Sequence, residues 1–120
     1  SSNLSEQQKL KFREILTRAF TETAQNREET SKLKGVLFET LASAKYDANK
    51  VNEIKRRLVK LNKQRMDKMF KALDEVQELV GYLKPEERSQ VFRHMSPDGD
   101  HFHPFNWGEP IINEAPDSFF

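Results

Sequence analysis

The chain has 120 residues, 32% of them charged, and its formal net charge at pH 7 is +1. Such a length forms one domain with its own apolar core, and the near balance of charge excludes a general attraction to nucleic acid or to membranes. Because the chain contains no Cys, disulfides and thiolate metal sites are excluded as well. No stretch has the pattern of a signal peptide or a membrane span, so we expect any targeting segment or membrane anchor to lie outside this sequence.

Helix-breaking residues are scarce in the first three-quarters of the chain, which also lacks runs of β-branched residues. This composition predicts an all-α protein with long helices. The first helix is expected to begin at Ser5, because its hydroxyl and the side chain of Gln8 can form a capping box. The apolar stripe runs to Phe20, thins over residues 21–34 and resumes as far as Ala44. We therefore expect an exposed or bent stretch of helix in the middle of this region.

A longer helix is predicted after Asp47, which is a favourable N-cap residue. Its apolar positions follow steps of about 3.6 residues, whereas a strict heptad would lose register after Leu61. The pattern predicts a helix about 50 Å long with one continuous apolar side, packed on neighbouring helices. Because such one-sided helices cannot bury their stripes alone, antiparallel pairing and dimerisation are expected. The apolar positions are Val51, Ile54, Leu58, Leu61, Met66, Met69, Leu73, Val76, Val80 and Leu83.

A short final helix is predicted to begin at Pro85, because proline is acceptable at the first helical position. Lys84 stands where Ser or Thr would cap the helix better, and the acidic Glu86 and Glu87 mark its positive end. The residues of this helix that we expect to point inward are Val91, Phe92 and Met95.

Basic residues cover every non-apolar side of the long helix, with Asp67 as the only opposing charge among them. Such a run can attract acidic partners or unfolded, negatively charged segments. The alternative is a solvated surface balanced by Glu22, Glu28, Glu29 and Glu39 of a neighbouring helix. Nucleic-acid binding is not favoured, because no aromatic residues are interleaved with the charges. The residues expected to bind a partner or client are Lys55, Arg56, Lys60, Lys63, Arg65 and Lys68.

Residues 96–120 form a tail rich in Pro, Gly and aromatic residues, which either folds against a partner or stays mobile. A His-x-His pair on an extended segment can place both imidazoles near one Zn²⁺, Ni²⁺ or Cu²⁺ ion, and Asp100 can supply an oxygen ligand. The alternative is adventitious binding by ordinary surface histidines. The candidate metal ligands are His94, His101 and His103.

No pattern in the chain indicates catalysis, since it lacks a Cys nucleophile, a Gly-rich phosphate loop and a nucleophile elbow. We expect a non-enzyme that requires no cofactor. Met66, Met69 and Met95 stand at helical spacing and are expected in the core rather than at a soft-metal site.

Two short motifs, one before each of two predicted helices, resemble the paired LTxxQ motifs of the Spy/CpxP family of bacterial periplasmic stress proteins. That family is related to periplasmic heavy-metal sensors of the CnrX and ZraP type. The stretch "KYDANKV" between the motifs resembles the element that opens the family's long helix. The second motif departs from the family pattern, because Lys84 replaces Thr and Glu87 replaces Gln. The matching residues are Leu4, Ser5 and Gln8 in the first motif and Leu83, Pro85, Glu86 and Arg88 in the second.

The resemblance covers residues 4–95 and implies an elongated, bent four-helix hairpin that dimerises into a cradle with a concave surface. It implies a periplasmic protein that binds unfolded clients, or a periplasmic sensor domain, without ATP. The alternative is a Zn, Ni, Co or Cu sensing or resistance protein. The helical His ligands of the nickel and cobalt sensors do not carry over, because residues 1–93 contain no His. Any metal role must therefore use the histidines near and within the tail.

Overall fold

A computed structural model of the chain describes residues 5–95. The described part contains helices and no strand, as the predicted all-α class requires, and its four helices are α1 (Glu6–Glu22), α2 (Ala24–Ala42), α3 (Ala48–Val80) and α4 (Pro85–Met95). The molecule is elongated, with extents of 60 × 24 × 21 Å. The length of α3 agrees with the predicted long helix.

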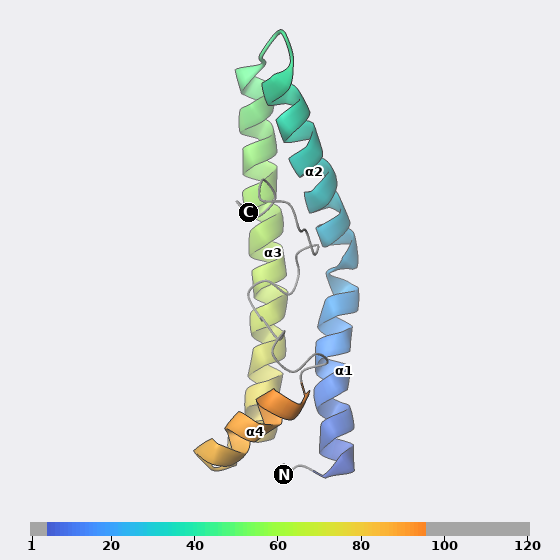
Figure 1. Ribbon diagram of the computed structural model, residues 1–120, viewed down its shortest axis with the longest axis vertical. Helices are drawn as coiled ribbons and strands as arrows, with labels where there is room; N and C mark the ends of the chain where they lie inside the picture. The colour runs from blue at the N-terminus through green and yellow to red at the C-terminus, as the bar shows by residue number, and fades with distance from the viewer. Residues whose placement is uncertain (1–4, 96–120) are drawn as a thin grey trace.

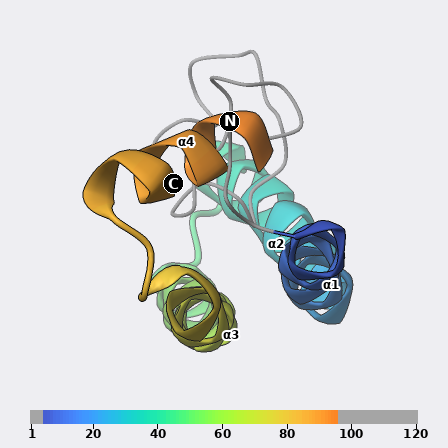
Figure 2. The ribbon, with the colours of Figure 1, turned by 90° about the horizontal axis from the view of Figure 1, so that it is seen from below.

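Two layers make up the body of the molecule. α1 and α2 follow each other along one side, and α3 runs back antiparallel beside both of them (Figure 1). α4 lies across one face of the pair formed by α1 and α3, near the end where α1 begins (Figure 2). This arrangement leaves the opposite face of the pair without a covering helix in the described part of the chain.

The helix starts agree with the predicted caps. The Gln8 amide donates to the Ser5 hydroxyl at 3.2 Å, and the Ser5 amide donates back to the Gln8 side chain at 2.9 Å, which completes the capping box. The carboxylate of Asp47 accepts from the Lys50 amide at 3.2 Å and caps α3. At the start of α4 the Glu87 carboxylate accepts from the Lys84 amide at 3.0 Å. Only the second half of a capping box forms there, because Lys84 has no side-chain oxygen.

Thr23 interrupts the helical run between α1 and α2, within the stretch that we expected to be exposed or bent. Its hydroxyl donates to the carbonyl oxygens of Ala19 at 2.9 Å and Phe20 at 3.1 Å. The Arg27 guanidinium also donates to the Phe20 carbonyl, at 2.9 Å, and to the Thr23 hydroxyl, at 2.6 Å. Side chains inserted into the backbone hydrogen-bond ladder in this way bend a helix. The bend therefore has a specific cause in Thr23 and Arg27.

The apolar core consists of two separate clusters. At the α4 end, Val91 is 0% exposed, and the ring of Phe92 meets the ring of Phe12 edge-on with 5.8 Å between centroids. The other cluster joins α2 to the first half of α3. The first cluster consists of Phe12, Ile15, Ala19, Ala72, Val76, Val80, Leu83 and Val91, and the second of Leu37, Val51, Ile54 and Leu58.

The predicted apolar stripe of α3 is mostly correct, with two local differences. Met66 and Leu73 are only half-buried, and the preceding residues Arg65 and Ala72 take the buried positions instead. The remaining predicted positions are buried within a single chain. Burial of the α3 stripe therefore does not require a second copy of the chain. The predicted homodimer remains a prediction, and it needs another apolar surface.

Candidate binding face

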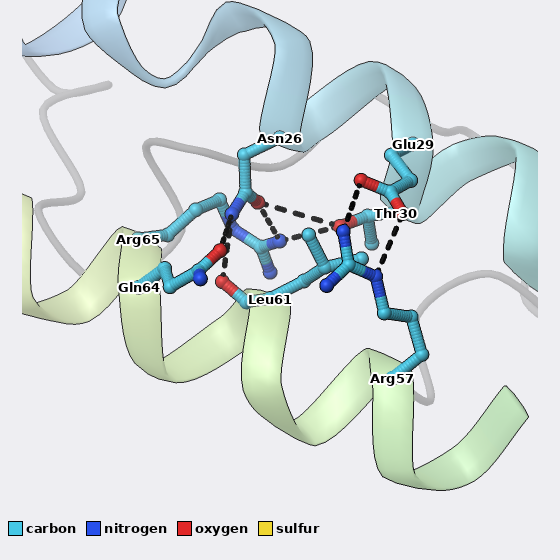
Figure 3. Close-up of polar contacts among 7 residues, drawn as sticks. All are labelled: Asn26, Glu29, Thr30, Arg57, Leu61, Gln64 and Arg65. Carbon is cyan, nitrogen blue, oxygen red and sulfur yellow. Dashed lines mark hydrogen bonds and ion pairs between the residues drawn. The ribbon is translucent and has the colours of Figure 1, made fainter. Parts of the chain in front are cut away.

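A buried polar cluster separates the two apolar clusters. At its centre Arg65 is 6% exposed, and its guanidinium donates to the side-chain amide oxygen of Asn26 at 2.7 Å and to the Thr30 hydroxyl at 2.6 Å (Figure 3). A further bond reaches the Asn62 side chain at 3.2 Å. Asn26 in turn donates to the main-chain oxygen of Leu61 at 2.9 Å. We call Asn26, Thr30 and Arg65 the polar seam, because together they tie α2 to α3 between the apolar clusters.

This placement corrects the prediction for Arg65, which we expected on the client-binding surface. Arg65 occupies a core position because it lies four residues after Leu61 and four before Met69, in step with the buried side of α3. The other predicted basic residues are exposed. Of these, Lys63 pairs with Asp67 at 2.9 Å and Lys68 pairs with Glu22 at 3.3 Å. Of the predicted binding residues, those that are exposed and form none of these pairs are Lys55, Arg56 and Lys60.

Charged residues lie just before the buried positions of both layers. They form ion pairs between the layers, from Arg18 to Glu75 at 3.3 Å and from Lys68 to Glu22 at the same distance. The third pair is bidentate, since the Arg57 guanidinium donates to both carboxylate oxygens of Glu29, at 2.7 and 2.8 Å (Figure 3). This hydrogen-bonded pair lowers the pKa of the Glu29 carboxyl and raises the pKa of the Arg57 guanidinium. We call this side of the molecule the ion-pair face.

The ion-pair face partly confirms the alternative interpretation of the basic run. Glu22 and Glu29 lie opposite basic residues of α3, as that interpretation requires. Glu28 instead pairs with Lys32 of its own helix, at 3.2 Å. Three residues of the basic run are therefore paired with acidic residues of the chain, and Arg65 is buried. The others, Lys55, Arg56, Lys60 and Lys71, are exposed.

Apolar residues lie just after the buried positions, in both layers. In an α-helix each step turns the side chain by about 100°, and in two antiparallel helices the residues one step after the contact positions turn to the same side of the pair. By the same geometry they lie opposite the ion-pair face. Seen from the end where α1 begins, the right-handed α1 turns clockwise away from the viewer, so the residues one step after its contact positions face the side that α4 crosses (Figure 2). We call this surface the apolar face. Its members are Leu16, Phe20, Phe38, Leu41, Val59, Met66, Phe70 and Leu73.

Large parts of these apolar side chains remain exposed, and positive groups lie beside them. Phe38 is 41% exposed and Phe70 is 43% exposed. The Arg27 guanidinium lies 3.7 Å from the centre of the Phe20 ring, in cation–π geometry. Burial lowers the pKa of Arg27, and the nearby positive charge of Arg65 lowers it further. An exposed surface with aromatic rings and neighbouring cations is suited to bind a segment that carries apolar and acidic side chains.

The predicted motif residues gather at the α4 end of the molecule. Leu83 is buried, and the Arg88 guanidinium donates to its carbonyl oxygen at 2.7 Å. Pro85 and Glu86 form the first turn of α4. The Gln8 side chain of the first motif donates to the hydroxyl of Tyr82, next to the second. Both motifs therefore cap helices and fix one end of the fold, while Leu4 lies outside the described residues.

The metal prediction falls largely outside the described residues. His94 belongs to α4, but its side chain is not described, and His101 and His103 lie in the tail. Among the described side chains, no group of three or more His, Cys, Asp or Glu residues is placed to hold a metal ion. The metal site remains a prediction, which calorimetric titration with Zn²⁺, Ni²⁺, Co²⁺ and Cu²⁺ can test.

Comparisons with protein-family models, curated proteins and solved structures find no match to this chain. Within residues 5–95, no helix is both long enough and apolar enough to cross a membrane.

Proposed function

We propose that the protein is a non-enzymatic binding protein of the Spy/CpxP type, which binds unfolded clients or a signalling partner in the periplasm without ATP. The observation that carries this proposal is the apolar face, where rings such as Phe38 and Phe70 are partly exposed and the Arg27 guanidinium lies over the ring of Phe20. The paired motifs, which lie at the starts of α1 and α4, support the family assignment. The four helices then correspond to the bent hairpin that the resemblance implies.

Binding on this face proceeds in two steps. Exposed positive charges on α3, such as Lys55, Arg56 and Lys60, attract an acidic segment over distances of about 10 Å. Apolar side chains of the segment then displace water from the rings, and each fully buried large side chain contributes about 1.5–3 kcal/mol. Unfolded chains expose both kinds of residue, whereas folded proteins bury most of the apolar ones. This difference favours unfolded clients over folded ones.

A homodimer is the second part of the proposal. Because the stripe of α3 is buried within one chain, the apolar face is the surface left for a second copy to cover. If two copies touch only along the edges of their apolar faces, the dimer encloses a cavity between the faces in which a client can bind. Sedimentation velocity at micromolar concentration tests this part separately from client binding.

The test of the proposed function is protection of an unfolded client from aggregation. Phe38→Ser combined with Phe70→Ser is expected to weaken protection, because both rings lie on the apolar face. Tyr46→Ser is the matched control, since Tyr46 is a 57% exposed aromatic residue in the loop between α2 and α3. Circular dichroism confirms that each variant keeps its helices. An equal loss in the control would show that the apolar face is not the binding surface.

A further inference from the structure

We propose that residues 96–120 bind to the apolar face of their own chain and so compete with clients for it. The tail can bind to the apolar face whether or not the protein binds clients. Only the competition with clients rests on the proposed function. The tail is the segment that follows α4, and α4 already crosses this face (Figure 2). Charge, apolar content and reach each favour the tail as the occupant.

Charge divides the chain at Met95. Residues 1–95 contain all 20 Lys and Arg residues and 14 of the 19 acidic residues, which gives this part a net charge of +6. Residues 96–120 contain the other five acidic residues and no Lys or Arg, which gives a net charge of −5. The near neutrality of the whole protein therefore hides two oppositely charged parts. An acidic segment attached to a basic body is attracted to it at short range.

The tail also carries the apolar side chains that the face can bind. They lie between residues 102 and 120, among turn-forming and acidic residues. A segment of this kind resembles the client that the face is expected to recognise, with rings for the apolar surface and carboxylates for Arg27 and Lys55. The apolar residues of the tail are Phe102, Phe105, Trp107, Ile111, Ile112, Phe119 and Phe120.

The tail is long enough to cover the face. An extended chain spans about 3.3 Å per residue, so residues 96–120 reach on the order of 80 Å, whereas the long axis of the molecule measures 60 Å. α4 runs from the α3 side of the molecule toward α1, and it ends at Met95 (Figure 2). From there the tail can pass along the face toward Phe38.

Attachment to the same chain makes even weak docking effective. A tethered segment has an effective concentration on the order of 1 mM. If the isolated tail bound with a Kd of about 0.1 mM, docking would lower the apparent affinity for a client about tenfold. Removing the docking contacts from the tail is therefore expected to raise client affinity by about that factor.

Trp107 provides a direct measurement, because it is the only Trp of the chain. In the full-length protein its emission is expected at shorter wavelength, and its quenching by acrylamide weaker, than in the isolated peptide 96–120. Phe38→Ser with Phe70→Ser is expected to move both values toward those of the peptide, and Tyr46→Ser is expected to leave them unchanged. Values equal to those of the peptide in the unmodified protein overturn the proposal. Protection of Trp107 that disappears on dilution assigns the face to a second copy and also overturns it.

A second full-length variant separates this inference from the proposed function. Phe102→Ser, Phe105→Ser and Phe119→Ser together remove tail contacts and leave the face intact, and Asn106→Ser with Asn113→Ser is the matched control. Stronger client protection by the first variant alone supports competition, and unchanged protection overturns it. If neither the unmodified protein nor the tail variant protects any client, the proposed function fails. In that case the Trp107 measurement still decides the docking.

Discussion

Replacement of Arg65 by Ala tests the role of the polar seam in stability. The substitution removes the donors to the side-chain amide oxygen of Asn26 and the Thr30 hydroxyl, which Arg65 reaches at 2.7 and 2.6 Å. Hydrogen bonds to a charged group contribute about 1.5–3 kcal/mol each. The third bond, to Asn62, adds little because Asn62 is exposed. We therefore expect Arg65→Ala to lower the free energy of unfolding by about 3 kcal/mol or more.

Urea unfolding followed by circular dichroism measures this loss. Lys60→Ala is the matched control, because Lys60 lies on the same helix and is exposed, and its effect is expected to stay within about 0.5 kcal/mol. If Arg65→Ala costs no more than Lys60→Ala, the seam makes no net contribution to stability and our interpretation of it is wrong.

A third variant asks whether the polar groups are needed at all. Arg65→Met, Asn26→Leu and Thr30→Val together replace the seam by apolar side chains. Exchanges of this kind in other proteins are often neutral or stabilising, because the desolvation cost of the buried charge disappears. We expect the triple variant to recover most of the stability that Arg65→Ala loses. The seam then serves to fix the register of α2 against α3 rather than to hold them together.

Three further changes test other parts of the fold. The pKa of Glu29 in the folded protein lies below that of a free glutamate, which is about 4.3. The pair with Arg57 therefore stabilises the fold above about pH 4.3, and this stabilisation is lost as the pH falls through the folded-state pKa. Glu29→Gln is expected to make the free energy of unfolding depend less on pH in this acidic range. Ser5→Ala is expected to cost about 1 kcal/mol in urea unfolding, because it removes the capping box of α1. Phe12→Ala is expected to cost about 3–5 kcal/mol and to free α4, which hydrogen exchange of the Val91 amide can detect.

The local signals in the sequence predicted the helix starts well. A cap depends on residues within one turn of each other, so Ser5 with Gln8, and Asp47 alone, indicate where α1 and α3 begin without knowledge of any neighbour. Pro85 did the same for α4. The bend at Thr23 was predicted only as a broad stretch, because it depends on a side chain that bonds back to Phe20 together with Arg27.

The site was harder to predict, and the buried position of Arg65 shows why. A basic residue in a run of basic residues looks like part of a solvated surface, and only the positions of Leu61 and Met69 indicate that Arg65 belongs to the buried side. The apolar face was missed for a related reason. Val59 and Phe70 fall outside the single stripe, so they look like isolated exposed residues until they are compared with Phe20 and Phe38 on the other layer.

The difference between the ion-pair face and the apolar face affects which surface a partner can bind more than it affects the stability of the fold. Each ion pair between the layers involves side chains that are at least a third exposed, and because solvent screens pairs of this kind, they contribute little to stability. Apolar residues in the same places would add more burial energy, but they would also make that side of the molecule adhesive. Charges on one face and rings on the other therefore restrict any apolar partner to the side that α4 crosses. Our two proposals therefore assign a client and the tail to the same surface, which is why we expect them to compete.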